Sequence, residues 1–248
     1  YPKDKVSQPG YEAVSPKNSF ASSAYADSLK RIPVEYIPRV VDLDKDVTKT
    51  PVSGESVLYS VQNKVNDIFE LGITWYRGTD SDRNLRIVPD YLSLAGTDSL
   101  SLQQLKSTLR RLGAKMYFES DKNTFSASLS APDRNLEEVL AMLRHFIGHV
   151  ACDDKAVGEL KSAVKVSGSS FDKSNSDIAS AVLAYVSRGS ESRFLQQFNE
   201  SDIKAVGAGG MVRSFKDAAA PGCDVVYSGN RAPEEVAAFL KEYLPSCG

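Results

Sequence analysis

Apolar residues recur at helical spacing through most of the chain after about residue 40. The clearest segment is 135–150, where apolar positions follow an i, i+3, i+4 period and Glu137 and Glu138 fall in the first turn, as the helix dipole favours. The segment 101–112 shows the same period and ends before Gly113, a residue suited to a helix C-terminus. The pattern predicts further helices over 83–94, 153–166, 178–187, 191–198 and 233–244.

Alternating apolar and polar residues predict strands at 57–61, 68–76, 116–118, 124–129 and 223–229. Short polar turns separate the first strand from the second and the third from the fourth, which predicts two hairpins. Hairpins thus alternate with groups of helices. This order predicts an α+β fold, in which helices cover one face of a mostly antiparallel sheet. It also suggests an internal duplication of two halves, each similar to a ferredoxin-like split βαβ module.

The first 40 residues differ from the rest in composition. Six of the eleven prolines fall within the first 51 residues, among Gly, Ser and Lys. Because proline fixes φ and lacks an N–H group, it opposes both helix and central strand. We therefore expect a Pro-rich linker or arm over 1–40, with one short helix near 19–29 and an extended stretch over 31–38. A single domain is expected over 41–248.

Composition excludes several classes of protein. The 248 residues are 42% hydrophobic and 25% charged, as in globular domains, and the net charge of −2 gives no electrostatic case for nucleic acid or an anionic membrane. No apolar run has transmembrane length, and no apolar signal segment opens the chain, which lacks an initiator Met and is expected to be a mature form or fragment. Two groups of basic residues suit an acidic partner: the first is Lys106, Arg110 and Arg111, and the second is Arg188 and Arg193. Scattered surface charge is the favoured explanation for both groups.

Three cysteines, Cys152, Cys223 and Cys247, form an odd set without CxxC spacing. This argues against both a zinc ribbon and a disulfide framework. Cys152 stands near a predicted helix start, where the pKa of a thiol falls. A semi-buried structural cysteine is the favoured interpretation.

Two histidines, His145 and His149, lie at i, i+4 in the helix 135–150. Zinc-binding helices use this spacing together with a Glu as general base and a third protein ligand. The residues between them are Phe, Ile and Gly, so we favour structural histidines at the edge of a core-facing helix over a metal site. Two histidines also leave little from which to build a catalytic triad. The glycine-rich stretch 207–210 lacks a P-loop Lys-Ser/Thr and predicts a flexible loop between helices.

Three stretches carry a resemblance to a known family: 57–76, 91–113, and Val225-Val226-Tyr227-Ser228-Gly229 followed by a helix. Over roughly 40–244 the sequence is similar to the M16 metallopeptidase family, which includes pitrilysin and the mitochondrial processing peptidase. It looks like a non-catalytic domain of the large bacterial members. The resemblance implies the LuxS/MPP-like metallohydrolase fold, and the Pro-rich start resembles the linker between successive M16 domains.

In active M16 members one helix carries the zinc motif H-x-x-E-H ahead of a Gly-Thr pair. Aligning that pair on 96–97 implies a degenerate zinc site, with Ile87 and Tyr91 at the histidine positions and Asp90 at the general-base position. The third ligand would be a Glu on the helix 153–166, where Glu159 is the only Glu and matches a non-ligand position by its spacing. Apolar and aromatic groups cannot hold Zn²⁺. We therefore expect no metal on this chain and zinc only on a partner domain.

The resemblance also implies a function. It implies a catalytically inactive domain that completes the peptide-binding chamber of a zinc metallopeptidase, with the active site on another domain of the same polypeptide or on a partner subunit. Peptide substrate would add as a strand at a sheet edge. Tyr76, Arg77 or Tyr91 would be candidates for the Arg and Tyr that assist from the opposite half. The alternative is a stand-alone peptide- or protein-binding scaffold; a periplasmic or secreted bacterial location is implied in either case.

Overall fold

The computed structural model describes residues 22–33, 42–169, 174–192 and 194–244. The chain divides into two units, Tyr1–Val41 and Asp42–Gly248. In the first unit α1 (Ala24–Lys30) overlaps the short helix expected near 19–29, and the hydroxyl of Ser23 accepts the N–H of Ala26 at its start. The rest of the expected Pro-rich arm, 1–21 and 34–41, lies outside the described residues.

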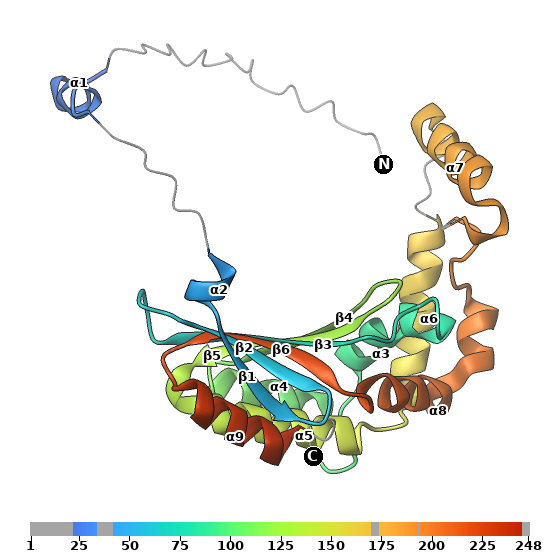
Figure 1. The fold of residues 1–248 in the computed structure, drawn as a ribbon. Helices are drawn as coiled ribbons and strands as arrows, with labels where there is room; N and C mark the ends of the chain where they lie inside the picture. The colour runs from blue at the N-terminus through green and yellow to red at the C-terminus, as the bar shows by residue number, and fades with distance from the viewer. Residues whose placement is uncertain (1–21, 34–41, 170–173, 193, 245–248) are drawn as a thin grey trace, which may run out of the picture. The chain divides into compact units, whose positions relative to one another are not determined.

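The second unit is built on one six-stranded sheet (Figure 1). The order across the sheet is β1-β2-β6-β3-β5-β4. Only β2 and β6 run parallel, and the other neighbouring pairs run antiparallel, which confirms the mostly antiparallel sheet. The expected internal duplication stays a prediction. The strands are β1 (Thr48–Ser53), β2 (Ser56–Gln62), β3 (Ile68–Trp75), β4 (Lys115–Ser120), β5 (Phe125–Pro132) and β6 (Cys223–Gly229).

The hairpin predicted between the first two strands is wrong. β6 lies between β2 and β3, with Tyr59 of β2 opposite Val226 of β6. The N–H of Asn63 donates to the carbonyl oxygen of Gly229 at 2.9 Å, so the chain after β2 passes the end of β6 before it enters β3. A short polar segment can connect two adjacent strands of a hairpin or two strands with a third strand between them. Here β6, which is distant in sequence, inserts between β2 and β3, so the segment makes the second kind of connection.

The hairpin partner of β2 is β1, a strand that the sequence pattern did not predict. This strand is mostly polar and contains Pro51, a residue that sheets tolerate at edges, and β1 is an edge strand. The second predicted hairpin is confirmed as β4 and β5, with Met116 opposite Leu129. β4 forms the other edge of the sheet.

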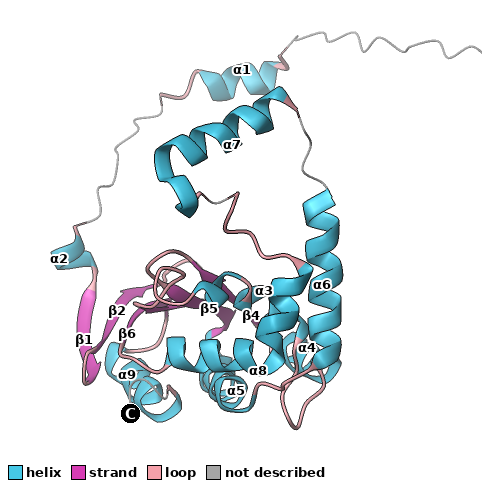
Figure 2. Cartoon of the chain, turned by 90° about the vertical axis from the view of Figure 1, so that its right-hand side faces the viewer, coloured by secondary structure: helices cyan, strands magenta, loops and turns pink. Residues whose placement is uncertain are grey.

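Helices cover one face of the sheet, as predicted (Figures 1 and 2). In the described part of the chain, no helix is long and apolar enough to cross a membrane. The helices of this unit are α2 (Leu43–Asp46), η1 (Arg83–Arg86), α3 (Val88–Leu94), α4 (Leu102–Arg111), η2 (Asp133–Asn135), α5 (Leu136–His149), α6 (Asp154–Ser169), α7 (Asn175–Arg188), η3 (Gly189–Glu191), α8 (Glu200–Ala219) and α9 (Pro233–Tyr243).

The helix predicted over 191–198 is not formed. After the short η3, the carbonyl oxygen of Ser192 accepts the N–H groups of Leu195 and Gln196 at 2.9 and 3.1 Å, which closes one turn only. Leu195 is 59% exposed while Phe198 is buried, so the apolar residues do not share one buried face. Packing therefore overrides the helical spacing.

The glycine-rich stretch 207–210 lies where two helical segments of α8 meet, as the sequence predicted, but a kink at one residue joins them and not a flexible loop. Gly207 has φ 62° and interrupts the helical geometry at a kink. Ile203 before the kink and Phe215 after it are both fully buried. Both helical segments therefore pack against the core, and this packing offsets the weak helix propensity of glycine.

The core lies between the sheet and the helices. Alternate residues of β3 point into it, and Trp75 is fully buried. Phe118 of β4 joins the helix layer to the sheet, because its ring centre lies 5.6 Å from that of Phe146 in α5 and 5.3 Å from that of Phe215 in α8. On the opposite face the alternate residues are half-buried or exposed, and Val226 is 56% exposed. Within the described residues, this face of the sheet is therefore less covered than the face that packs on the helices.

Candidate functional site

The positions that the resemblance assigns to a zinc site lie at the start of α3. Ile87 precedes the helix and is 4% exposed, and Tyr91 follows one turn later and is fully buried. The N–H of Tyr91 donates to the carbonyl oxygen of Ile87 at 3.1 Å. Pro89 falls in the first turn, where its missing N–H group costs no helical hydrogen bond. Residues 87–94 thus form a short helix that buries the two presumed ligand positions.

The Tyr91 hydroxyl has both of its hydrogen-bonding roles filled. It donates to the carbonyl oxygen of Ala151 at 2.6 Å and accepts the N–H of Asp153 at 2.9 Å. Burial raises the pKa of Tyr91, and the hydrogen bond from Asp153 opposes that shift only in part. The hydroxyl therefore stays protonated at neutral pH and joins α3 to the residues that begin α6.

Asp90 is the one carboxylic acid at the three positions. Asp90 lines a cavity with Leu160 and Val164 of α6, and partial desolvation raises the pKa of its carboxyl. Glu159 lines a different cavity and lies 3.9 Å from the ammonium group of Lys155. Among the described residues, no three His, Cys, Asp or Glu side chains gather into a group that could hold a metal. The residues at this site do not fit a zinc ion, which requires three or four N, O or S ligands.

The two histidines contact the loop that follows α3. The Nε2 atom of His145 lies 3.1 Å from the hydroxyl of Thr97 and 3.0 Å from that of Ser99. The Nδ1 atom of His149 lies 2.8 Å from a carboxylate oxygen of Asp98, and this hydrogen bond is the main cause of the lowered pKa of Asp98. The imidazole rings stack with centres 4.9 Å apart. In this arrangement the histidines fasten the loop 97–99 to the end of α5.

Of the candidates for the substrate-assisting pair, Tyr76 and Tyr91 differ sharply. Tyr76 is 64% exposed at the end of β3, and its hydroxyl donates to the carboxylate of Asp224. That hydrogen bond is the main cause of the raised pKa of Tyr76. Tyr91 is fully buried and has no path to a substrate. Arg77 is exposed next to Tyr76, so these two remain candidates and Tyr91 does not.

The cysteines separate by exposure. Cys152 is exposed just before α6, so the semi-buried structural interpretation is wrong for it. It lies in the short segment between α5 and α6, two positions after the buried Val150. Cys223 is buried at the start of β6, where its N–H donates to the hydroxyl of Ser56 at 3.1 Å. Cys247 lies outside the described residues.

A cavity beside the edge strand β4 was not predicted from the sequence. It has a volume of 250 Å³ and lies between α3, α4 and β4, with Asp90, Ser93 and Lys106 among its polar lining. Alternating apolar residues in β4 and leucines in α4 indicated core positions, but the sequence carried no sign that a gap remains between them. The apolar and aromatic lining consists of Pro89, Leu92, Leu102, Leu105, Leu109, Met116, Tyr117, Phe118 and Phe146.

No protein-family model matches the sequence, and a search of curated proteins finds no match. Solved structures do match. The inactive M16 peptidase domain from Pseudomonas fluorescens superposes with a TM-score of 0.69 at 15% identity, over 82% of this chain and 50% of that one. The chain has the fold of M16 peptidase domains.

Larger M16-like structures match with similar quality. The periplasmic protease PqqL from Escherichia coli gives a TM-score of 0.65 at 16% identity, over 86% of this chain and 26% of its own. The ferredoxin protease FusC, solved in complex with Arabidopsis ferredoxin, gives 0.67 at 12% identity, over 87% of this chain and 26% of its own. The chain therefore spans about a quarter of the length of these two proteases.

Proposed function

We propose that this chain is a catalytically inactive M16-like domain that completes the peptide-binding chamber of a zinc metallopeptidase. The observation that carries the proposal is the state of Tyr91. In an M16-like fold it occupies a position assigned to a zinc-binding histidine, and its only polar side-chain atom is fully hydrogen-bonded to Ala151 and Asp153. Ile87, at the other histidine position, has no ligand atom. The metal and the general base then belong to another domain or subunit.

The partner in this proposal is another M16-like domain, in the same polypeptide or in a second subunit. The support is the coverage of about a quarter of PqqL and FusC, which leaves room in each for further domains. Because PqqL is a periplasmic protease, we propose a periplasmic or secreted location for this chain as well.

Peptide binding in this proposal uses the edge of β4. In the described part of the sheet β4 pairs only with β5, so the main-chain groups on its far side have no strand partner. An extended peptide can pair with such an edge through its main chain, and its alternate side chains then point to the same side. The adjacent apolar cavity of 250 Å³ offers a place for one large apolar side chain.

Metal and peptidase assays test the proposal. The purified 248-residue chain is expected to contain no stoichiometric zinc by mass spectrometry and to cleave no peptide. One tightly bound zinc per chain, with peptidase activity that His145→Ala abolishes, would overturn it. The native polypeptide with this segment deleted supplies the second arm: activity that is indifferent to the segment contradicts the chamber role.

A peptide pair tests the edge-strand contact directly. A fluorescent peptide of alternating Phe and Thr is expected to bind the chain, and the same peptide with Pro in place of every Thr is expected not to, because proline lacks the N–H group that a strand requires. Binding of both peptides with equal affinity contradicts pairing at β4. If the chain binds the peptide but its gene stands apart from any zinc-motif M16 gene, the stand-alone scaffold becomes the better interpretation.

A further inference from the structure

A second cavity lies between η1, the tip of the β4–β5 hairpin and the segment after α7. Its volume is 490 Å³. Four cations line it, Arg83, Arg86, Lys122 and Arg188, against one carboxylate, that of Asp80. The whole chain has a net charge of −2, so this excess of positive charge is local and does not reflect the composition.

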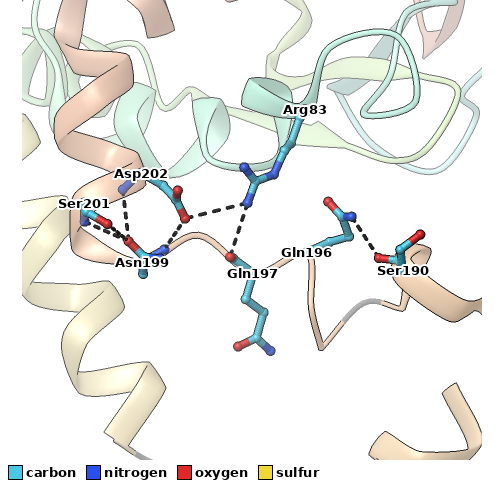
Figure 3. A network of polar contacts seen from close by, with 7 residues as sticks. All are labelled: Arg83, Ser190, Gln196, Gln197, Asn199, Ser201 and Asp202. Carbon is cyan, nitrogen blue, oxygen red and sulfur yellow. Dashed lines mark hydrogen bonds and ion pairs between the residues drawn. The ribbon is translucent and has the colours of Figure 1, made fainter. Parts of the chain in front are cut away.

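Arg83, which lines this cavity, contacts residues at the start of α8 and just before it (Figure 3). Its Nη2 atom lies 3.7 Å from a carboxylate oxygen of Asp202 and 3.5 Å from the carbonyl oxygen of Gln197. Its guanidinium group also lies 4.4 Å from the ring centre of Phe198. Asp202 is fixed in turn, because it accepts the N–H of Asn199 at the start of α8. These contacts fix the guanidinium of Arg83 and occupy part of its hydrogen-bonding capacity.

The other three cations have no such partner. Arg86, Lys122 and Arg188 are exposed, and none of them forms an ion pair with another described residue. They come from η1, the hairpin tip and the end of α7, so three separate segments of the chain bring them to one cavity. Like charges that gather without counter-charges repel one another, and an anion relieves this repulsion.

The hairpin tip that carries Lys122 is rigidly placed. The N–H of Thr79 donates to the carbonyl oxygen of Asp121, and the N–H of Asp80 donates to that of Lys122, both at 2.9 Å. On the far side, the amide of Gln196 donates to the carbonyl oxygen of Ser190 at 3.0 Å (Figure 3). Backbone hydrogen bonds on one side of the cavity and a side-chain hydrogen bond on the other therefore hold its walls, as a binding site requires.

We propose that this cavity binds the carboxylates of an acidic peptide segment. Arginine pairs with carboxylates through two parallel hydrogen bonds, and Arg86 and Arg188 form no ion pair with any carboxylate of the described residues. Cations from three segments match several carboxylates along an extended peptide better than one compact anion. This site is separate from the β4 edge, and the proposal does not depend on the chamber role.

Binding of a labelled peptide to the 248-residue chain tests the proposal. The probe is a fluorescein-labelled peptide of alternating Glu and Gly with an amidated C-terminus, and its matched control carries Gln in place of Glu. The Glu peptide is expected to bind more tightly, by about tenfold or more, with an affinity that falls as salt rises. A Gln–Gly peptide with a free C-terminus distinguishes a terminal carboxylate from side-chain carboxylates as the bound group.

Variants locate the binding. Each of Arg86→Gln, Lys122→Gln and Arg188→Gln is expected to weaken binding about twofold to fivefold, and the triple variant tenfold or more. The control triple, Lys64→Gln with Arg134→Gln and Lys241→Gln, changes the net charge equally and is expected to leave binding within about twofold. Equal losses in the two triples overturn the proposal. Displacement of the peptide by inorganic phosphate at equimolar concentration also overturns it, in favour of a phosphate site.

Discussion

The hydroxyl of Tyr91 accepts the N–H of Asp153 at 2.9 Å and donates to the carbonyl oxygen of Ala151 at 2.6 Å. These contacts join α3 to the start of α6, across a sequence separation of about 60 residues. The M16 resemblance assigns zinc ligands to the same two elements. The two hydrogen bonds therefore connect α3 to the segment that leads into α6.

Tyr91→Phe is expected to destabilise the fold without changing its metal content. The substitution leaves the half-buried carbonyl of Ala151 and the N–H of Asp153 without this partner, which costs about 1–3 kcal/mol of unfolding free energy. Urea denaturation followed by circular dichroism measures the loss. Tyr117→Phe is the control, since Tyr117 is 53% exposed and its loss of a hydroxyl is expected to cost less than about 0.5 kcal/mol. Equal effects of the two substitutions contradict the bridging role of Tyr91.

The contact between His149 and Asp98 predicts a pH dependence of stability. The hydrogen bond from His149 lowers the pKa of Asp98 below 3.8, so the unfolded chain binds this proton more readily than the folded one. The resulting stabilisation is fully present above about pH 5 and is lost as the pH falls through 3.8 toward the lowered value. Asp98→Asn is therefore expected to show a smaller loss of unfolding free energy than the wild type when the pH falls below about 5, as measured by urea denaturation at several pH values.

Asp217→Asn serves as the control for that measurement. Asp217 is exposed on α8 and forms no ion pair or side-chain hydrogen bond with the described residues. Its variant is expected to follow the wild-type curve of stability against pH. If Asp98→Asn also follows that curve, the hydrogen bond to His149 does not contribute to stability in solution.

Local patterns in the sequence predicted the elements better than their arrangement. The helix 135–150 and the second hairpin are found as α5 and the β4–β5 pair, because side-chain periodicity reports which residues are buried. The position of β6 between β2 and β3 could not be read in this way. Its pairing with Tyr59 joins residues more than 160 positions apart, and no local pattern records such a partner.

The candidate site shows the same division. Alignment on the Gly-Thr pair located Ile87, Asp90 and Tyr91, and the structure places them at one helix start. The partners of the Tyr91 hydroxyl are backbone groups, which any residue type supplies, so the sequence could not indicate them. In the sequence, Arg188 with Arg193 is a basic pair that suits an acidic partner, but scattered surface charge is the favoured explanation there, and Arg193 lies outside the described residues. The position of Arg188 beside Arg86 and Lys122 emerges only from the folded chain.

The hydrogen bond between α9 and α5 predicts an unusual tyrosine titration. The hydroxyl of Tyr243 donates to a carboxylate oxygen of Glu137 at 2.9 Å, and this bond is the main cause that raises the pKa of Tyr243 from 10.0 to about 12. Glu137→Gln is expected to return the pKa toward 10.0, since the neutral amide no longer favours the protonated phenol. NMR of ¹³C-labelled tyrosine at about pH 11 measures the ionised fraction. Glu138→Gln is the control, and an equal shift in both variants contradicts the assignment.

Two glycine substitutions are expected to change stability in opposite directions. A Cβ atom at Gly78 would lie 2.3 Å from the carbonyl oxygen of Lys122 and 2.4 Å from that of Asp121, both in the backbone of the hairpin tip. Gly78→Ala must therefore displace the tip, at a cost of about 2 kcal/mol or more. Gly158 lies within α6 with no atom near its missing Cβ, so Gly158→Ala is expected to add about 0.5–1 kcal/mol through helix propensity. Thermal and urea unfolding measure both, and a tolerated Gly78→Ala contradicts the close backbone contact that positions Lys122.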